Sequence, residues 1–340
     1  MNEKIKVNVS LSVYNILKKD MELFEFYKQD FKLNKNLFYV TLITNYYELF
    51  NEQEKERTHL IKKYLKDNSN MSDSHLNQIS IELSKKLGEM KAYDEDEKYD
   101  IALSIKPTKA SLGAITYIEN YLLNNISLSN FYRNLFSSYA RLPQDLREQI
   151  IFKPAYDKIQ QAIKEDKKLF VVSTSNKPSE ISPYTLAKSK EELFNYLLCT
   201  NDTGKPITFR LSRLKDITIL NDQRNIGESK KELLNKMIEM GPQYSITTLN
   251  QEPILIKLTD NGIQQFKTSY VNRPEPVKIE NNIYTFNCSY SQIHQYFRRF
   301  GSNATILQPK ELQNRLKQFY KQGFYHYKNL EDKNNIQETT

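Results

Sequence analysis

The sequence predicts an α+β protein of several domains, and three observations support this expectation. The chain has 340 residues, more than one compact core usually organises, with 39% hydrophobic and 26% charged residues, enough to build cores. The order strand, helix, helix occurs twice within residues 1–145. Closely spaced short strands then follow residue 167, as in a small β-barrel. We expect an N-terminal domain over 1–145, a β-domain over 146–228 and an α/β extension over 229–330.

The first strand-helix-helix unit, residues 1–51, begins with an alternating segment. One face of this strand carries Ile5, Val7, Val9 and Leu11, and the other carries Lys4, Lys6, Asn8 and Ser10. Ser12 is placed to cap a helix over 12–28, and a second helix is expected over 35–50. One short strand and two helices cannot bury these apolar faces alone, so the unit needs a partner.

That partner is expected within the chain, as a second unit over 99–142. The segment from Leu33 aligns with the segment from Ile126 at a fixed offset of 93. This offset superposes Phe38 on Phe131, Tyr39 on Tyr132, Leu42 on Leu135 and Tyr46 on Tyr139. A strand candidate (99–107) and a helix candidate (108–125) precede the second copy, so the pattern predicts a duplication. Residues 52–98 are charged and partly helical, and the acidic run "YDEDEKYD" (93–100) predicts a solvated link.

In the β-rich region, the stretch "ITFRLSRLKDITIL" (207–220) is expected to form one strand with an apolar stripe on its odd positions. Arg213 and Lys215 interrupt that stripe. Two explanations are open from the residues alone. Either the strand bulges and turns the charges outward, or the face lines a pocket for an anionic ligand.

The same region resembles the WYL domain, a small Sm-like or SH3-like β-barrel of bacterial regulators. Asn195, Tyr196 and Leu197 stand at the positions of its Trp-Tyr-Leu motif, although the chain contains no Trp. Residues 209–214 match the following Arg-rich strand, with Ser212 where Asp is usual, and Pro183 and Leu186 fit a Pro-x-x-Leu strand. The resemblance implies a barrel groove for an anionic ligand, nucleic acid or a nucleotide, and so favours the pocket explanation for the arginines rather than for Lys215.

Two further resemblances concern the ends of the chain. Residues 296–320 are similar to the helix-strand-helix extension that follows many WYL barrels and contributes to dimerisation, which implies a homodimer. The N-terminal units look like ribbon-helix-helix folds, whose strands pair into a two-stranded ribbon. This combination resembles the accessory proteins encoded beside compact RNA-targeting type VI CRISPR effectors, which implies a CRISPR effector protein as a partner.

The candidate ligand residues follow from the WYL resemblance. Arg210 and Arg213 are the main candidates, because a guanidinium donates in pairs to phosphate and stacks on bases. Tyr196 is expected to offer a stacking face to a base. Ser173, Tyr184 and Lys188 are weaker candidates on neighbouring strands. The alternative is a solvated strand in which Arg213 pairs with Asp216 or Asp222.

A second candidate nucleic-acid surface is the polar face of the first ribbon strand, where long donors would read base edges in a major groove. Its residues are Lys4, Lys6, Asn8 and Ser10. The equivalent face of the second copy is acidic and small, with Asp100, Ala102, Ser104 and Lys106. This asymmetry weakens a sequence-specific DNA repressor. Arg298 and Arg299 either extend a basic track or are the solvated side of a helix.

Composition favours an anionic partner and gives little support to catalysis. The formal charge is +8 and the pI is near 9.0. The two cysteines and four scattered histidines show no metal-ligand spacing, and no Gly-rich phosphate loop is present, so we expect no cofactor, no metal and no enzymatic activity. Since no signal peptide or membrane-length apolar run is visible, we expect a soluble cytoplasmic protein.

The sequence therefore predicts a non-enzymatic regulatory or accessory protein that binds single-stranded nucleic acid, RNA in particular, through the WYL groove and modulates a CRISPR effector. The alternative is a transcriptional regulator whose ribbon reads DNA and whose WYL domain senses an effector. A third class is a protein adaptor with an incidental basic surface.

Overall fold

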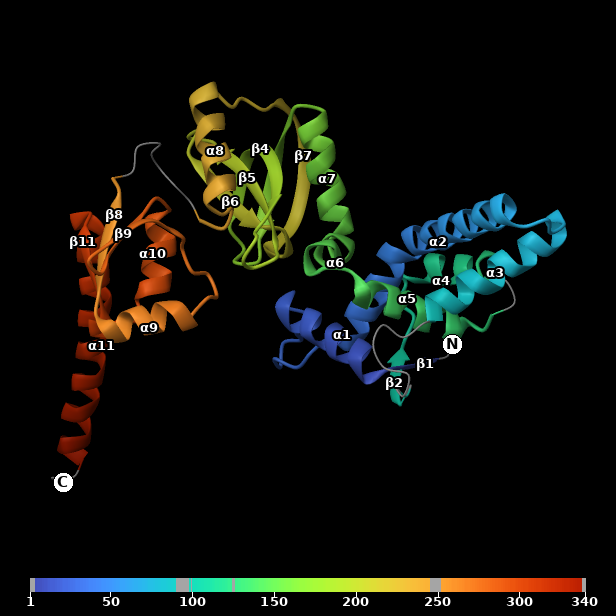
Figure 1. Ribbon diagram of the computed structural model, residues 1–340, viewed down its shortest axis with the longest axis horizontal. Helices are drawn as coiled ribbons and strands as arrows, with labels where there is room; N and C mark the ends of the chain where they lie inside the picture. The colour runs from blue at the N-terminus through green and yellow to red at the C-terminus, as the bar shows by residue number, and fades with distance from the viewer. Residues whose placement is uncertain (1–3, 90–97, 99, 124–125, 245–251, 338–340) are drawn as a thin grey trace. The chain divides into compact units, whose positions relative to one another are not determined.

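A computed structural model describes residues 4–89, 98, 100–123, 126–244 and 252–337 (Figure 1). The chain divides into two compact units. The first comprises residues 1–157 with 211–213, and the second comprises 158–210 with 214–340. Helices and antiparallel sheets occur in both units, which confirms the predicted α+β class.

In the first unit, two strands from distant parts of the chain form a two-stranded antiparallel sheet. β1 (Ile5–Val9) pairs with β2 (Ile101–Ile105), with Val7 opposite Leu103. Two helices follow each strand: α1 (Leu11–Leu23) and α2 (Lys35–Asn68) follow β1, while α4 (Leu112–Tyr121) and α5 (Leu128–Arg141) follow β2. The predicted repetition of strand, helix, helix is thus confirmed. The apolar face of each strand is the buried one, as the alternation predicted.

The two copies share one aromatic core, in which α2 packs against α5. All eight residues that the repeat superposes are at most 4% exposed. Rings of one copy pack against rings of the other. The distance between ring centroids is 6.4 Å for Phe38 and Tyr139, 6.2 Å for Tyr46 and Tyr139, and 5.5 Å for Phe50 and Phe131. Each copy therefore covers the apolar face that the other could not bury alone.

Three boundaries differ from the expectation. Ser10, not Ser12, caps α1: its hydroxyl accepts from the Val13 N–H, so the helix begins at Leu11. α2 continues to Asn68 instead of ending near residue 50. A further helix, α3 (Asp73–Glu89), packs against α2, so much of the expected solvated link is a helical pair. Most of the acidic run over 93–100 lies outside the described residues.

A buried ion pair ties α1 to α6 (Gln144–Ile151). Arg147 Nε lies 2.6 Å from Asp20 Oδ2, and Arg147 Nη2 lies 3.0 Å from Asp20 Oδ1. The Tyr139 hydroxyl donates to the same carboxylate at 2.8 Å, and Arg147 Nη1 donates to the Leu142 carbonyl. The Asp20 side chain is fully buried. These bonds connect three helices around one desolvated charge.

The second unit begins within α7 (Lys153–Lys164), which follows α6 after a break at Phe152. A five-stranded antiparallel sheet follows, in the order β6-β5-β4-β3-β7. Its strands are β3 (Lys167–Ser173), β4 (Pro178–Lys188), β5 (Asn195–Asn201), β6 (Pro206–Arg210) and β7 (Leu214–Gln223). Among the described strands no pairing joins β6 to β7, so the sheet is not the closed barrel that the sequence predicts. Helix α8 (Glu228–Met240) packs on β4, β5 and β6.

The stretch 207–220 is not one strand. A 3₁₀ turn, η1 (Leu211–Arg213), separates β6 from β7. Leu211 and Ser212 are buried, whereas Arg213 and Lys215 are exposed. The turn breaks the alternation of side chains, because three residues that would lie along one strand instead complete a helical turn. The charges that interrupt the apolar stripe are thus turned outward, which was the first of the two open explanations.

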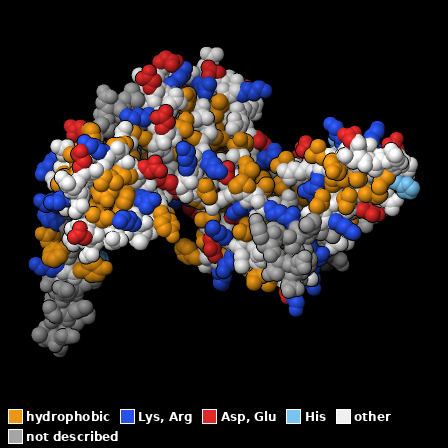
Figure 2. All heavy atoms as spheres, viewed as in Figure 1, with side chains coloured by type: hydrophobic (Ala, Val, Ile, Leu, Met, Phe, Trp, Pro, Cys, Tyr) orange, Lys and Arg blue, Asp and Glu red, His pale blue; other side chains and the backbone are white. Residues whose placement is uncertain are grey.

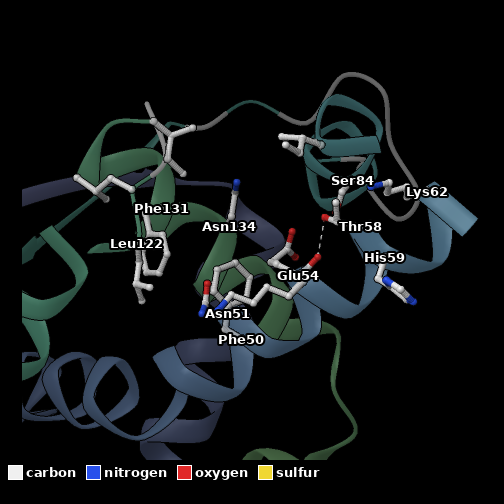
Figure 3. A pocket seen from close by; sticks show the side chains of 14 residues that line it. Phe50, Asn51, Glu54, Thr58, His59, Lys62, Ser84, Leu122, Phe131 and Asn134 are labelled. Carbon is white, nitrogen blue, oxygen red and sulfur yellow. Dashed lines mark hydrogen bonds between the residues drawn. The ribbon is translucent and has the colours of Figure 1, made fainter. Parts of the chain in front are cut away.

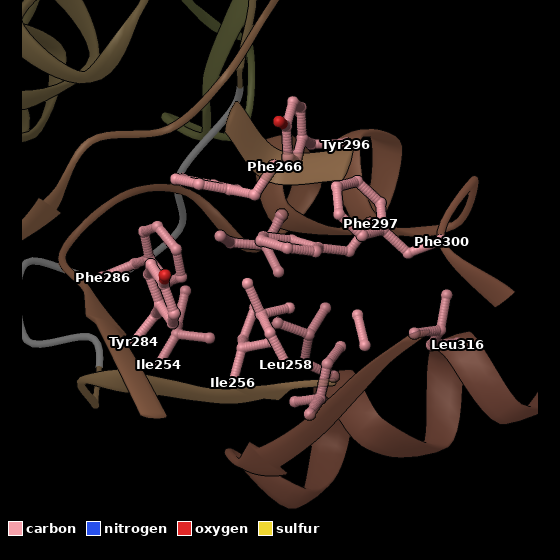
Figure 4. Packing of buried hydrophobic residues seen from close by; sticks show 14 residues of the cluster. Ile254, Ile256, Leu258, Phe266, Tyr284, Phe286, Tyr296, Phe297, Phe300 and Leu316 are labelled. Carbon is pink, nitrogen blue, oxygen red and sulfur yellow. The ribbon is translucent and has the colours of Figure 1, made fainter. Parts of the chain in front are cut away.

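The C-terminal module has a four-stranded antiparallel sheet in the order β11-β8-β10-β9. Its elements are β8 (Ile254–Leu258), α9 (Asp260–Thr268), β9 (Pro276–Glu280), β10 (Ile283–Phe286), α10 (Tyr290–Phe297), η2 (Gly301–Asn303), β11 (Ala304–Gln308) and α11 (Lys310–Gln337). The last helix-strand-helix arrangement confirms the prediction, whereas α9 and β9 were not predicted. Phe266, Phe286 and Phe297 pack together in its core (Figure 4).

Two glycines make a matched stability test. A Cβ at Gly262, in the first turn of α9, would lie 2.2 Å from the Asn303 carbonyl oxygen, which is backbone and cannot move aside cheaply. We expect Gly262→Ala to lower the free energy of unfolding by about 1–3 kcal/mol, as overpacking does. Gly113, inside α4, has open space where an added Cβ would lie. Gly113→Ala should therefore raise the free energy of unfolding by about 0.5–1 kcal/mol. Urea unfolding followed by circular dichroism measures both, and equal effects would contradict the predicted contrast.

Candidate nucleic-acid interface

Arg210 and Tyr196 lie directly opposite each other on neighbouring strands. They are register partners in the antiparallel pair β5–β6, so their side chains share one face of the sheet. The Arg210 guanidinium lies over the ring of Phe194, with Cζ 3.5 Å from the ring centroid. This cation–π contact holds the planar group in one place on the sheet.

Tyr196 does not have the surroundings of a stacking platform. Its side chain is 8% exposed, and its hydroxyl donates to the Glu192 carboxylate. Phe194, beneath Arg210, is also buried. The role predicted for Tyr196, stacking on an unpaired base, is therefore at odds with the structure, because a hydroxylated ring in a strand that is buried on both faces packs inward.

Arg213 belongs to the turn η1 and is exposed. Its Nε lies 3.5 Å from Glu25 Oε1, so its ion pair is with Glu25 and not with Asp216 or Asp222, the partners of the alternative. The turn is anchored by the Ser212 N–H, which donates to the fully buried Glu148 at 3.1 Å. An exposed ion pair contributes little free energy, so the pair of Arg213 and Glu25 adds little to the stability of the fold.

The weaker candidates are dispersed over the sheet. Ser173 ends β3 opposite Leu214, and its Oγ lies 2.8 Å from Ser175 Oγ. The Tyr184 hydroxyl donates to Asn235 Oδ1 on α8 at 2.9 Å, which gives this ring a structural role. Lys188 is the exposed last residue of β4, opposite Asn195. Of the three, Lys188 lies nearest in register to the pair of Tyr196 and Arg210.

On the ribbon, Lys4, Lys6 and Asn8 are exposed as predicted, but Ser10 is not part of that surface. Ser10 is 2% exposed and serves as the N-cap of α1. Arg133 was not among the predicted residues, and its Nε donates to the Asn8 carbonyl at 2.8 Å. Arg133 stands on α5, so it places a cation of the second copy beside the first strand.

The two arginines at the end of α10 differ in their surroundings. Arg299 donates from Nη2 to the Val271 carbonyl at 2.9 Å and from Nε to the Tyr296 carbonyl at 3.0 Å, and it lies over the Tyr296 ring. These hydrogen bonds connect the end of α10 to the chain at Val271, so Arg299 has a structural role and is a poor candidate for a basic track. Both arginines are exposed, and Arg298 has its Cζ 5.8 Å from the Phe319 ring centroid.

The surroundings of the two cysteines do not favour the thiolate form. Burial raises the pKa of the Cys199 thiol far above its ordinary value and that of Cys288 to about 12. Within the described ranges no three His, Cys, Asp or Glu side chains gather as a metal site. None of the described helices is both long and apolar enough to cross a membrane. On the face shown in Figure 2, basic, acidic and hydrophobic side chains are interspersed.

Comparison with known proteins gives information on the fold. The solved structure described as a CRISPR Cas-related protein matches with a TM-score of 0.67 at 17% identity, over 97% of this chain and 95% of that chain. Proteasome accessory factor B/C (PafBC) of Arthrobacter aurescens aligns over 65% of this chain and 36% of that chain, with 14% identity and a TM-score of only 0.22. No protein-family model and no curated protein matches the sequence. The first comparison shows that the chain shares its fold, over nearly its whole length, with the CRISPR Cas-related protein.

Proposed function

We propose that this chain is a non-enzymatic, nucleic-acid-binding regulatory protein of the WYL type, which binds single-stranded RNA through Arg210 and Arg213 and modulates a CRISPR effector. The observation that carries this proposal is the placement of Arg210, fixed on Phe194 within the strand that matches the WYL motif. The whole-chain fold shared with a protein described as CRISPR Cas-related supports the CRISPR part of the proposal.

The other parts of the chain fit accessory roles in this proposal. The N-terminal units act as a tandem pair of ribbon-helix-helix-like folds, whose intramolecular strand pair β1–β2 takes the place of a ribbon shared between two chains. The C-terminal module, with exposed Phe324 and Tyr327 on α11, supplies the surface for a homodimer in the cytoplasm.

Salt dependence tests the proposed mode of binding. Phosphate contacts release counterions, so the logarithm of the binding constant should fall linearly with the logarithm of salt concentration, by about 0.7 for each phosphate contacted on a single strand. Anisotropy titrations of a labelled single-stranded RNA at several salt concentrations measure this slope. A slope near zero, or no binding at low salt, would contradict the proposal.

A second candidate is a DNA-binding regulator, favoured by the exposure of Lys4, Lys6 and Asn8 on β1. The facing residues of β2, Ser104 and Ala102, offer no cation, so the ribbon presents one basic strand rather than two. Footprinting on duplex DNA separates the two candidates. A discrete protected site that disappears in a Lys4→Ala, Lys6→Ala variant would favour the DNA-binding regulator.

A further inference from the structure

The first compact unit contains a cavity of about 670 Å³ that was not predicted from the sequence (Figure 3). Its walls are one face of the second half of α2, residues on α3, residues on α5, and Leu122, Leu123 and Ile126 from the chain between α4 and α5. The volume lies within the range of small-molecule sites in proteins. None of the residues that line it lies in β6 or η1, so the cavity is distinct from the proposed RNA-binding arginines.

One end of the cavity is aromatic and apolar. Phe50 and Phe131 form its floor, with ring centroids 5.5 Å apart and planes at 85°, and Leu122 lies beside them (Figure 3). Both phenylalanines are at most 4% exposed and are held in the core that the two copies share. A fixed edge-to-face pair offers a flat ring a rigid apolar surface.

The middle of the cavity is polar. Glu54 lines it, with Oε1 2.8 Å from Arg57 Nη1, and burial raises the pKa of this carboxyl despite the nearby arginine. Ser84, on the facing helix α3, is 2% exposed, and its hydroxyl has no hydrogen-bond partner among the described residues. A buried hydroxyl without a partner costs about 1–3 kcal/mol, which a ligand with hydroxyl groups would recover.

The other end of the cavity is lined by basic residues. Lys55, His59 and Lys62 stand on α2 at spacings of four and three residues, so they share one face of the helix. Figure 3 shows His59 and Lys62 at the end of the cavity opposite Leu122 and Phe131. From Phe50 to Lys62 the helix rises by about 18 Å, at 1.5 Å for each residue. The lining thus changes from aromatic to polar to basic along one helix.

We propose that this cavity is a binding site for a nucleoside phosphate, with the base against Phe50 and Phe131, the sugar hydroxyls at Glu54 and Ser84, and the phosphates at His59 and Lys62. The aromatic, polar and basic parts of the cavity follow one another in the same order as the base, the sugar and the phosphates of a nucleotide. A fatty acid would leave the buried Ser84 hydroxyl without a hydrogen-bond partner, and inorganic phosphate would not use the aromatic end. Binding at this site would allow a small molecule to regulate the proposed RNA-binding protein from a site separate from its RNA-binding surface.

The test is a calorimetric titration of the full chain with ATP and with GTP. At least one of them should bind, and Lys62→Glu should weaken that binding at least tenfold by reversing a charge at the phosphate end. Lys63→Glu is the matched control, since it makes the same change on the adjacent residue, which does not line the cavity, and should leave the affinity within about twofold. Circular dichroism melting verifies that both variants are folded.

Two results of the titrations of the unchanged chain and the two lysine variants would overturn the proposal. One is no heat of binding with either nucleotide at millimolar concentration, or binding of palmitate or inorganic phosphate instead. The other is equal weakening by Lys62→Glu and Lys63→Glu. The titration is repeated on the Arg210→Ala, Arg213→Ala variant. Retained nucleotide affinity supports a separate site, whereas lost affinity places the nucleotide at the arginines and also overturns the proposal. Failure of RNA binding alone would leave the nucleotide result unchanged.

Discussion

Asp20→Ala is expected to lower the free energy of unfolding of the N-terminal unit by about 3–5 kcal/mol. The substitution leaves the guanidinium of Arg147 buried without its carboxylate, and removing one partner of a buried pair costs more than the pair itself contributes. It also removes the acceptor of the Tyr139 hydroxyl. Burial, together with the charge of Asp20, raises the pKa of Tyr139 well above its ordinary value, so this side chain remains a proton donor at all ordinary pH values.

Urea unfolding followed by circular dichroism measures this loss in the transition of the N-terminal unit. Glu22→Ala is the matched control, because Glu22 stands on the same helix with a half-exposed side chain that approaches Lys18 only to 4.0 Å. The control should change the free energy of unfolding by less than about 1 kcal/mol. Asp20→Asn should cause a loss of unfolding free energy between those of Asp20→Ala and Glu22→Ala, because it keeps a hydrogen-bond acceptor but loses the charge. A loss below 1 kcal/mol in Asp20→Ala would show that this pair does not hold α1 to α6.

Arg210→Ala combined with Arg213→Ala is expected to lower the affinity for single-stranded RNA at least a hundredfold. A hydrogen bond to a charged group contributes about 1.5–3 kcal/mol, so two phosphate contacts contribute about 3–6 kcal/mol, and each 1.4 kcal/mol is a factor of ten in affinity. Folding should change little for Arg213, whose ion pair with Glu25 is exposed. Arg210 packs on Phe194, so each single variant is also measured for thermal stability.

Lys215→Ala is the control for this pair. Lys215 is an exposed cation close to Arg213 in the chain, with a hydrogen bond to Asn176 at 3.3 Å. If only general positive charge attracts the RNA, Lys215→Ala and Arg213→Ala should have equal effects. The proposed contacts instead predict a change of less than about threefold for the lysine. Unchanged affinity in the double arginine variant would remove these residues from the site.

Much of the fold could be predicted because its strongest sequence signals are periodic and local. The alternation around Val7 identified β1, and the aromatic repeat of Phe38 with Phe131 identified the core that the two copies share. The repeat also implied that the two units need each other, and the ring contacts between α2 and α5 show how that need is met.

Other features depend on tertiary packing and cannot be predicted from local sequence patterns. The second half of α2 is rich in charged residues and looks solvated in sequence, but α3 packs against it. Both Ser10 and Ser12 suit a helix N-terminus, and only the end of β1 decides that Ser10 is the cap. The turn η1 is set by the hydrogen bond from Ser212 to Glu148, a residue far away in the chain.

The candidate site was predictable in outline but not in the role of each residue. The strand pairing places Tyr196 opposite Arg210, yet burial of Tyr196 depends on the surroundings of β5, and the bonds of Arg299 depend on a loop at Val271. The cavity was missed because its lining comes from four segments. The stripe from Phe50 to Lys62 on α2 was the one signal in the sequence, and it required a longer helix than the one predicted.

The most direct test of the central claim is a competition experiment on the full chain. A labelled single-stranded RNA is titrated with the protein, and unlabelled duplex DNA or unlabelled RNA is then added while the anisotropy is followed. RNA binding through Arg210 and Arg213 predicts that unlabelled RNA displaces the label at concentrations at least tenfold below those needed with duplex DNA. Equal or better displacement by duplex DNA, or no binding of the labelled RNA, would contradict it.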